Sequence, residues 1–170
     1  MPETGTSSFA DRPEWIIRRV TPADMPALLQ LCIDHAIYEK TIYTTEDVLE
    51  PLSRALFSQP PRLWSWVAEA DGALVGYATA SLEFSTWSAR EYLHMDCLFL
   101  SEPWRGKGAG RALIDAVIDL AKSKGVDRIE WQTPEWNTGA VRFYKDVGAT
   151  ATMKLRFTLR TDPSVRLHGQ

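Results

Sequence analysis

Residues 104–113 read WRGKGAGRAL, and they constrain the fold more than any other segment because they join an apolar run to an amphipathic one. The apolar run 92–101 predicts a strand, and the apolar spacing over 108–124 predicts a helix that ends at Gly125. Three glycines and three cationic residues at a helix start leave backbone N–H groups open to an anion, at the positive end of the helix dipole. The segment therefore predicts a phosphate site at a strand–helix junction.

This glycine-rich loop matches neither of the two common phosphate-binding motifs. The pattern GxxxxGK[ST] is absent, and GxGxxG would require a glycine where the chain has Arg111. No acidic residue follows a βαβ unit at the distance expected of a ribose ligand. Taken alone, the loop is also compatible with a glycine-rich turn that carries surface cations.

The rest of the chain predicts helices at the front, then antiparallel strands, then a strand–helix–strand unit. The further predicted helices are 21–36, 45–58 and 137–147, and the further strands are 15–20, 63–70, 73–82, 128–132 and 151–160. Asp71-Gly72 between two apolar runs predicts a tight hairpin. The pattern indicates one mixed α/β domain over 15–160, with a flexible leader at 1–14 and a polar tail at 161–170.

Composition narrows the classes of function. With 170 residues, 45% of them hydrophobic and 24% charged, the chain is long enough for one globular domain with a sizeable core. A net charge of -3 without a basic face argues against nucleic-acid binding. Cys32, Cys97 and the three scattered histidines lack metal-ligand spacing, so we expect no metal site and no disulfide. No apolar run is long enough to span a membrane, and we expect a cytoplasmic protein.

A second motif gives the glycine-rich loop a context. Arg105-x-x-Gly108-x-Gly110 and the pattern NxxAxxFYKxxGA at 137–149 together resemble the two signatures of the GCN5-related N-acetyltransferase (GNAT) superfamily. The segments HAIYEK, LEFSTWSAREYLHMDCLFL and PEWNTGAVRFYKDVGA extend the resemblance to its spermidine/spermine (diamine, thialysine) N-acetyltransferase branch, over residues 15–160. The resemblance implies an α/β GNAT fold, in which helices flank both faces of a mixed, mostly antiparallel central sheet.

The resemblance also implies acetyl-CoA as co-substrate, bound where two strands of the sheet separate, and no metal. Strand residues would pair with the pantetheine amides through their backbone, loop N–H groups would hold the pyrophosphate, and the motif at 137–149 would contact the pantetheine arm. The implied cofactor-binding residues are Leu98, Phe99, Leu100, Arg105, Gly106, Lys107, Gly108, Ala109, Gly110, Arg111, Asn137, Ala140 and Tyr144. Asn137 also suits a helix N-cap, so its two interpretations are compatible.

Two residues are candidates for proton transfer. By the resemblance, Tyr144 lies near the thioester sulfur, where a phenol is a plausible proton donor to the departing thiolate. Asp96 occupies the position of a glutamate that is proposed as the base in the diamine branch, and it acts directly or through a water. Strand alternation predicts that Asp96 shares one face with His94, Leu98 and Leu100. Core packing for Tyr144 and a structural hydrogen bond for Asp96 are the alternatives.

The resemblance places Tyr38, Glu39, Trp87 and Asp96 around the acceptor amine. The chain departs from the branch near that pocket, because Ser85 replaces an acidic residue and the family's acidic turn before the last strand becomes MKLR at 153–156. Fewer carboxylates and two added cations suit an acceptor that itself carries a carboxylate, such as an amino acid. The sequence leaves open whether Lys154 and Arg156 point inward.

These observations predict an acetyl-CoA-dependent N-acetyltransferase that acts by direct attack on the primary amine of a small diamine-like or amino-acid-like molecule. The alternatives are an acceptor that is a protein amine or an antibiotic-like compound, and a CoA-binding regulatory module without turnover. A Cys–His hydrolase built on His94 and Cys97 is disfavoured, because an odd separation on one strand sends them to opposite faces. The expected partners are a small amine and a second copy in a homodimer, without nucleic acid or membrane.

Overall fold

A sheet in the order β1-β2-β3-β4-β5 organises the chain in this computed structural model, which describes residues 14–159 and 161. The predicted leader, apart from Glu14, and the predicted tail, apart from Thr161, lie outside the described residues. The elements are β1 (Ile16–Arg19), the short 3-10 helix η1 (Pro22–Asp24), α1 (Met25–Tyr38), α2 (Leu49–Phe57), β2 (Trp64–Ala70), β3 (Ala73–Ser85), β4 (Arg90–Leu100), the 3-10 helix η2 (Glu102–Trp104), α3 (Ala109–Lys124), β5 (Ile129–Glu130) and α4 (Thr138–Val147).

The sheet is mixed and mostly antiparallel, as predicted. β1, β2, β3 and β4 pair antiparallel in succession, and β5 pairs parallel to β4. The turn between β2 and β3 falls at Asp71 and Gly72, whose φ angles are 50° and 75°. Two successive positive φ angles suit the twist of a two-residue hairpin, so the Asp-Gly prediction is confirmed.

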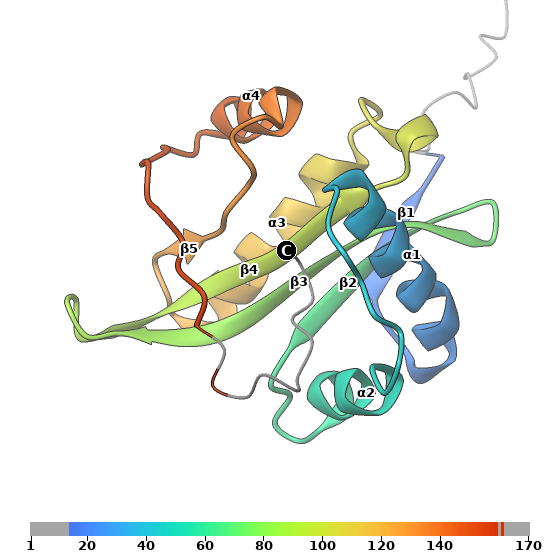
Figure 1. The fold of residues 1–170 in the computed structure, drawn as a ribbon, viewed down its shortest axis with the longest axis horizontal. Helices are drawn as coiled ribbons and strands as arrows, with labels where there is room; N and C mark the ends of the chain where they lie inside the picture. Colours follow the sequence, from blue (N-terminus) through green and yellow to red (C-terminus); the bar gives the residue numbers. More distant parts are fainter. Residues whose placement is uncertain (1–13, 160, 162–170) are drawn as a thin grey trace, which may run out of the picture.

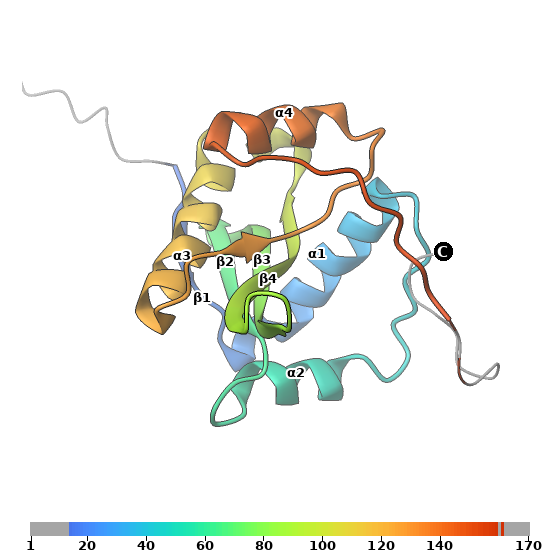
Figure 2. The same cartoon turned by 90° about the vertical axis from the view of Figure 1, so that its left-hand side faces the viewer.

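Helices cover both faces of the sheet, which confirms the predicted architecture (Figures 1 and 2). α3 packs Leu113 and Val117, both fully buried, against one face. α1 and α2 cover the other face, where Leu28 and Leu56 join a second core around Tyr77. Among the described helices, none combines the length and the apolar character that crossing a membrane requires.

β4 contains a bulge at Asp96. On β3, Thr79 pairs with Cys97 and the next residue, Ala80, pairs with Met95, so Asp96 has no partner residue there. A bulge adds one residue to one strand and reverses the alternation of faces beyond it. Leu93 and Met95 before the bulge, and Leu98 and Leu100 after it, therefore all pack on the α3 side.

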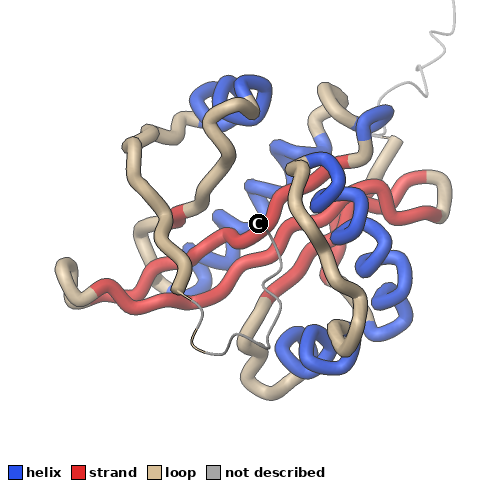
Figure 3. Tube along the Cα trace, viewed as in Figure 1, coloured by secondary structure: helices blue, strands red, loops and turns tan. Residues whose placement is uncertain are grey.

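The last predicted strand is wrong for the described residues. Residues 151–159 form neither strand nor helix, and Arg160 lies outside the described part of the chain. The alternating apolar residues that predicted a strand, Met153, Leu155, Phe157 and Leu159, are 80–88% exposed. Their alternation does not bury them against this sheet, because β5 is short and the chain beyond it turns away from β4 (Figure 3).

The second helix is shorter than predicted. α2 begins at Leu49 rather than at Thr45, and Pro51 falls in its first turn. A proline there removes no intrahelical hydrogen bond, because the N–H groups of the first turn have no partner within the helix. α2 keeps its place on the sheet through the buried side chain of Leu56.

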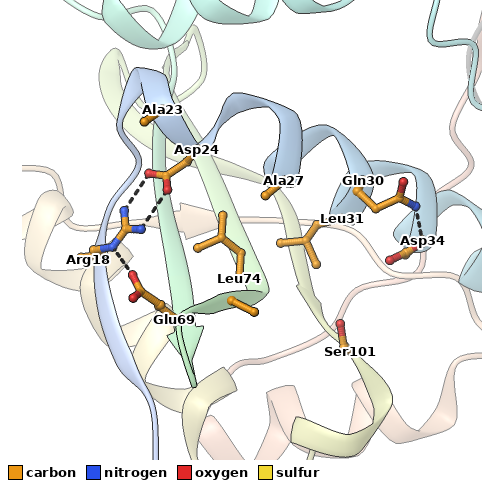
Figure 4. A pocket seen from close by; sticks show the side chains of 12 residues that line it. Arg18, Ala23, Asp24, Ala27, Gln30, Leu31, Asp34, Glu69, Leu74 and Ser101 are labelled. Atoms are coloured by element: carbon orange, nitrogen blue, oxygen red, sulfur yellow. Dashed lines mark hydrogen bonds and ion pairs between the residues drawn. The ribbon is translucent and has the colours of Figure 1, made fainter.

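Arg18 ties the first strand to the start of α1 and to β2. Its guanidinium donates to both carboxylate oxygens of Asp24, at 2.7 and 2.8 Å, and to Glu69 at 2.7 Å. Asp24 also accepts from the backbone and hydroxyl of Thr21, both at 2.8 Å. Figure 4 shows this cluster at the edge of a surface pocket of about 460 Å³. The Arg18 guanidinium holds the pKa of the Asp24 carboxyl well below its ordinary value.

The Asp24→Asn variant should lower the free energy of unfolding by about 1–3 kcal/mol at pH 7, because it removes charge-assisted hydrogen bonds. A carboxyl whose pKa is depressed by folding stabilises the protein above its ordinary pKa of about 4 and loses that contribution as the pH falls. The difference in the free energy of unfolding between wild type and Asp24→Asn should therefore shrink below about pH 4. Urea unfolding at several pH values measures it, with Asp34→Asn as the control, since Asp34 accepts only from Gln30 at the surface. An equal loss of stability in Asp24→Asn and Asp34→Asn would contradict the stabilising role given to Asp24.

Candidate functional site

A cavity of about 1210 Å³ opens where β4 and the chain after β5 separate. β5 pairs with β4 only at Leu93 and His94. Beyond that point the residues 132–134 and α4 diverge from β4, and the cavity fills the space. Most of the predicted site residues line it: Tyr38, Glu39, Asp96, Leu98, Phe99, Leu100, Arg105, Gly106, Gly108, Gly110, Arg111, Asn137, Ala140 and Tyr144.

The glycine-rich loop turns into α3 at the wall of this cavity. Gly106 and Gly108 have φ angles of 74° and 88°, in the left-handed region that favours glycine, and Gly108 is the N-cap of α3. At Gly110 a Cβ would lie 3.3 Å from Leu100 Cδ1 and 3.4 Å from Phe143 Cζ, so a side chain there would press on β4 and α4. The start of α3 thus presents backbone N–H groups to the cavity, an arrangement that fits a pyrophosphate.

The cations of the loop differ in their positions. Arg105 and Arg111 line the cavity, and Arg105 is held there because its Nε donates to the Leu100 carbonyl at 2.9 Å. Lys107 does not line the cavity; its Nζ lies 3.4 Å from Glu14 and 4.7 Å from the Trp104 ring centroid. Ala109 is fully buried beneath the loop. Two of the three loop cations are therefore placed to meet an anion.

Asn137 is the N-cap of α4, which confirms one of the two interpretations made from the sequence. It also lines the cavity, and its contact with the pantetheine arm stays a prediction. Its Oδ1 accepts from the backbone N–H of Ala140 at 3.2 Å and from the Tyr38 hydroxyl at 3.0 Å. The Tyr38 ring also lies 4.3 Å below the Arg105 guanidinium. Tyr38 therefore lies between two predicted cofactor ligands, although the sequence placed it at the acceptor.

Tyr144 projects from α4 into the cavity between aromatic neighbours. Its ring centroid is 5.1 Å from that of Trp131 and 5.4 Å from that of Phe143. Burial, with a smaller effect of the Glu39 carboxylate, raises the pKa of Tyr144 to about 12. The phenol is therefore neutral near pH 7 and available as a hydrogen-bond donor.

The bulge in β4 determines which groups lie next to the Asp96 side chain. Its Oδ1 lies 3.9 Å from His94 Nε2, and its Oδ2 accepts from the Cys97 thiol at 3.7 Å. The prediction that Asp96 shares a face with Leu98 and Leu100 is wrong, because the bulge turns those two side chains toward α3. Asp96 still lines the cavity, with about three-fifths of its side chain exposed.

The same bulge removes the argument that separated His94 from Cys97. Both residues line the cavity, since Cys97 packs with the α1 core rather than the α3 core. The disfavoured hydrolase still lacks support for a different reason. Burial raises the pKa of the Cys97 thiol to about 12, so the thiolate that such chemistry needs is scarce.

Glu39 forms part of a small polar cluster that the sequence analysis missed. Its Oε1 lies 3.5 Å from His35 Nε2, and His35 Nδ1 lies 3.0 Å from the Tyr77 hydroxyl. The His35 ring stacks on Phe99 with 5.0 Å between centroids. The spacing of four residues between His35 and Glu39 on α1 was the available signal, since such pairs lie on one helix face.

Trp87 differs from its predicted position at the acceptor. It is fully exposed in the turn between β3 and β4, and it does not line the cavity. The two strands stay paired out to Ser85 and Arg90, and this carries the turn away from the cavity. Lys154 and Arg156, whose direction the sequence left open, do line the cavity.

Comparisons with known proteins agree with this geometry. Residues 27–149 match the model of the acetyltransferase (GNAT) family. A thialysine N-epsilon-acetyltransferase from Caenorhabditis elegans is 28% identical over 145 residues, which cover 84% of this chain and 89% of that enzyme. An L-ornithine N5-acetyltransferase from Arabidopsis thaliana is 29% identical over 96 residues, which cover 56% of this chain and 42% of that enzyme. The aminoglycoside N-acetyltransferase AAC(6')-Iy, solved in complex with CoA, shares the fold with a TM-score of 0.73 at 20% identity, covering 87% of this chain and 95% of that one.

Both cysteines should behave as unreactive thiols in the folded protein. Burial raises the pKa of Cys32 as well as that of Cys97. At pH 7.5 we expect iodoacetamide to modify Cys97 at least about 100-fold more slowly in the native protein than in urea, because few molecules carry the thiolate. Mass spectrometry of tryptic peptides over time measures both rates. Rapid modification of native Cys97 would reopen nucleophilic chemistry at this residue.

Proposed function

The chain belongs to the acetyltransferase (GNAT) family and is an acyltransferase of the N-acetyltransferase type, and from this premise we propose that it moves an acetyl group from acetyl-CoA to the primary amine of a small molecule. The observation that carries the proposal is that one cavity joins the start of α3, the free edge of β4 and the side chains of Asp96 and Tyr144. These parts supply an anion cradle, a track for an extended ligand and two groups for proton transfer.

The described residues fit acetyl-CoA, which supplies a thioester-activated acetyl group. The N–H groups from Gly106 to Arg111 would hold the pyrophosphate, with charge from Arg105 and Arg111. The edge of β4 at Leu98–Leu100 is free of β5 and would pair with the pantetheine amides through its backbone. Asn137 would contact the same arm, and AAC(6')-Iy, which shares the fold, was solved with CoA.

Proton transfer in this proposal runs from the acceptor to Asp96. The acceptor amine loses a proton to the Asp96 carboxylate, directly or through a water, and its nitrogen then attacks the thioester carbon. The new C–N bond forms as the C–S bond breaks, the electron pair leaves on sulfur, and the second proton of the nitrogen passes to the thiolate, so that the products are the amide and the CoA thiol. Because its pKa is raised to about 12, above the ordinary thiol value of about 8.5, Tyr144 stabilises that thiolate by a hydrogen bond without having to release its proton.

Small amines are the acceptor class that the relatives favour. The matched enzymes of Caenorhabditis elegans and Arabidopsis thaliana are named for acetylating thialysine and L-ornithine. The part of the cavity that Glu39 and Asp96 line is where an amine would approach. A cytoplasmic location, where thiols stay reduced, suits the two free cysteines.

A homodimer completes the proposal. The exposed apolar side chains Met153, Leu155, Phe157 and Leu159 lie along one segment without a partner strand in the described chain. A row of this kind suits a contact with a second copy. Sedimentation equilibrium measures the mass in solution, and a monomer at micromolar concentration would exclude the dimer.

Thiol release from acetyl-CoA, followed with a disulfide reagent, tests the proposed function. The panel contains polyamines, diamines, basic amino acids, an aminoglycoside and a lysine-containing peptide. We expect turnover with at least one small primary amine. Tight CoA binding without turnover on any of these amines would instead indicate a non-catalytic CoA-binding module.

The Tyr144→Phe variant should lower kcat about 100-fold, because it removes the donor to the departing sulfur and leaves the ring packing intact. The KM for acetyl-CoA should change little. Tyr92→Phe is the matched control, because Tyr92 lies on β4 against Arg128 and outside the cavity. An unchanged kcat in Tyr144→Phe would remove the residue from the chemical step.

The Asp96→Asn variant should move the acidic limb of the pH profile of kcat/KM to higher pH. Without the carboxylate, the reacting amine has to lose its proton to solvent, and its ordinary pKa is about 10. Asp119→Asn on α3 makes the same chemical change outside the cavity and should keep the wild-type profile. A profile of Asp96→Asn that superposes on wild type would exclude Asp96 as the base.

A further inference from the structure

Two cations reach the cavity from the segment that follows α4. In Figures 1 and 2 this segment leaves α4 and runs across the side of the sheet that α1 and α2 cover. All four residues 153–156 are exposed, but Met153 and Leu155 do not line the cavity, whereas the alternating residues Lys154 and Arg156 do. In an extended segment, alternate side chains point in opposite directions. The segment therefore directs its two cations toward the cavity, where they stay accessible to solvent, and its apolar residues away from it.

Neither cation has a partner within the described part of the chain. No hydrogen bond, ion pair or ring contact involves Lys154 or Arg156 there. The cavity cations near α3 differ, since Arg105 donates to the Leu100 carbonyl and Arg111 pairs with Asp115 at 3.0 Å. Two unpaired cations that face the same cavity are poised for an anion.

The carboxylates of the cavity already have neighbours. Glu39 and Asp96 are the carboxylates among the described lining residues. Glu39 lies against His35, and Asp96 lies against His94 and the Cys97 thiol. Within the described part of the chain, Lys154 and Arg156 thus have no carboxylate partner in the cavity, which leaves both free to meet the anion of a ligand.

The position of the segment separates this anion from the pyrophosphate. β5 pairs with the first half of β4, whereas η2 and the start of α3 follow the end of β4. In Figure 1 the segment after α4 passes on the β5 side of the sheet, away from η2. The segment therefore approaches the cavity from the β5 side, away from the proposed pyrophosphate site, and the acceptor is the ligand that its cations would meet.

We propose that Lys154 and Arg156 bind a carboxylate of the acceptor, so that the acceptor is an amino acid whose reacting amine lies toward Asp96. This inference rests on the proposed function and narrows its acceptor class. An arginine guanidinium suits the planar geometry of a carboxylate, and a lysine adds a point charge. A polyamine brings a further ammonium group toward two cations, and such a like-charge contact disfavours it.

Matched pairs of acceptors test the inference. Ornithine and putrescine, and likewise lysine and cadaverine, differ by one carboxylate. We expect wild type to have at least about a 10-fold higher kcat/KM for the amino acid of a pair, and the double variant Lys154→Gln/Arg156→Gln to lose that preference. In the double variant, kcat/KM should fall for the amino acid and should stay unchanged or rise for the diamine. The KM for acetyl-CoA should stay unchanged.

Two control variants and a binding measurement show whether a lost preference comes from the charge, from its position or from a loss of turnover. Arg142→Gln/Lys145→Gln removes the same charge from exposed positions on α4 outside the cavity and should keep the preference. Arg156→Lys keeps the positive charge and should keep part of the preference for the amino acid. Calorimetric binding of the amino acids to CoA-loaded protein gives a readout without turnover, and the double variant should weaken it about 10-fold or more.

Three outcomes would overturn the inference: a wild type that prefers the diamine, an equal loss on both members of a pair, and a raised KM for acetyl-CoA alone. Turnover on diamines without a preference for amino acids would refute this inference and leave the proposed function intact. Failure of every amine, with CoA bound and amino acids unbound, would refute both.

Discussion

The early separation of β4 from β5 is the constraint on which the rest of the site depends. Only Leu93 and His94 pair with β5, yet β4 continues to Leu100 and stays paired with β3 along that length. The outer edge of its last residues is left with backbone groups that water or a ligand has to satisfy. A full ladder to β5 would have closed the cavity and buried those groups in the sheet. The fold thus keeps one strand half-paired, and that half is what an extended ligand can bind.

The bulge at Asp96 adds the chemistry to this opening. A regular strand would place Leu98 and Leu100 on the cavity face and would turn Cys97 away. The extra residue instead keeps Leu93, Met95, Leu98 and Leu100 on the α3 core, while Phe99 joins the α1 core, and it gathers His94, Asp96 and Cys97 on the cavity side. The same bulge therefore serves both packing and the proposed function, because the leucines stay in the core while the polar residues line the cavity.

The local parts of the structure could be predicted from the sequence, and the non-local parts could not. The glycine-rich turn, the Asp71-Gly72 hairpin and the N-cap at Asn137 depend on residues within a few positions of one another, and each was predicted. The bulge depends on register between two strands, so alternation alone assigned Leu98 and Leu100 to the face of His94 and Asp96, although both leucines pack toward α3. The strand expected at 151–160 failed over the described residues for a similar reason, since an alternating pattern does not show whether a neighbouring strand is present to pair with it. Trp87 was placed at the acceptor by the resemblance alone, which does not show how far β3 and β4 carry their turn from the cavity.

The two ends of the cavity differ in the kind of group that recognises a ligand. In the proposed function, the groups that would recognise the donor are mostly backbone: the N–H groups at the start of α3 and the edge of β4, for which the side chains need only be small or well packed. At the acceptor end they are side chains from α1, β4 and the segment after α4. Backbone recognition tolerates changes of sequence as long as the fold persists, whereas side-chain recognition changes with single residues. This difference explains why the glycine-rich motif, together with the pattern at 137–149, predicts the donor in so divergent a chain, and why the acceptor has to be inferred from side chains such as Lys154 and Arg156.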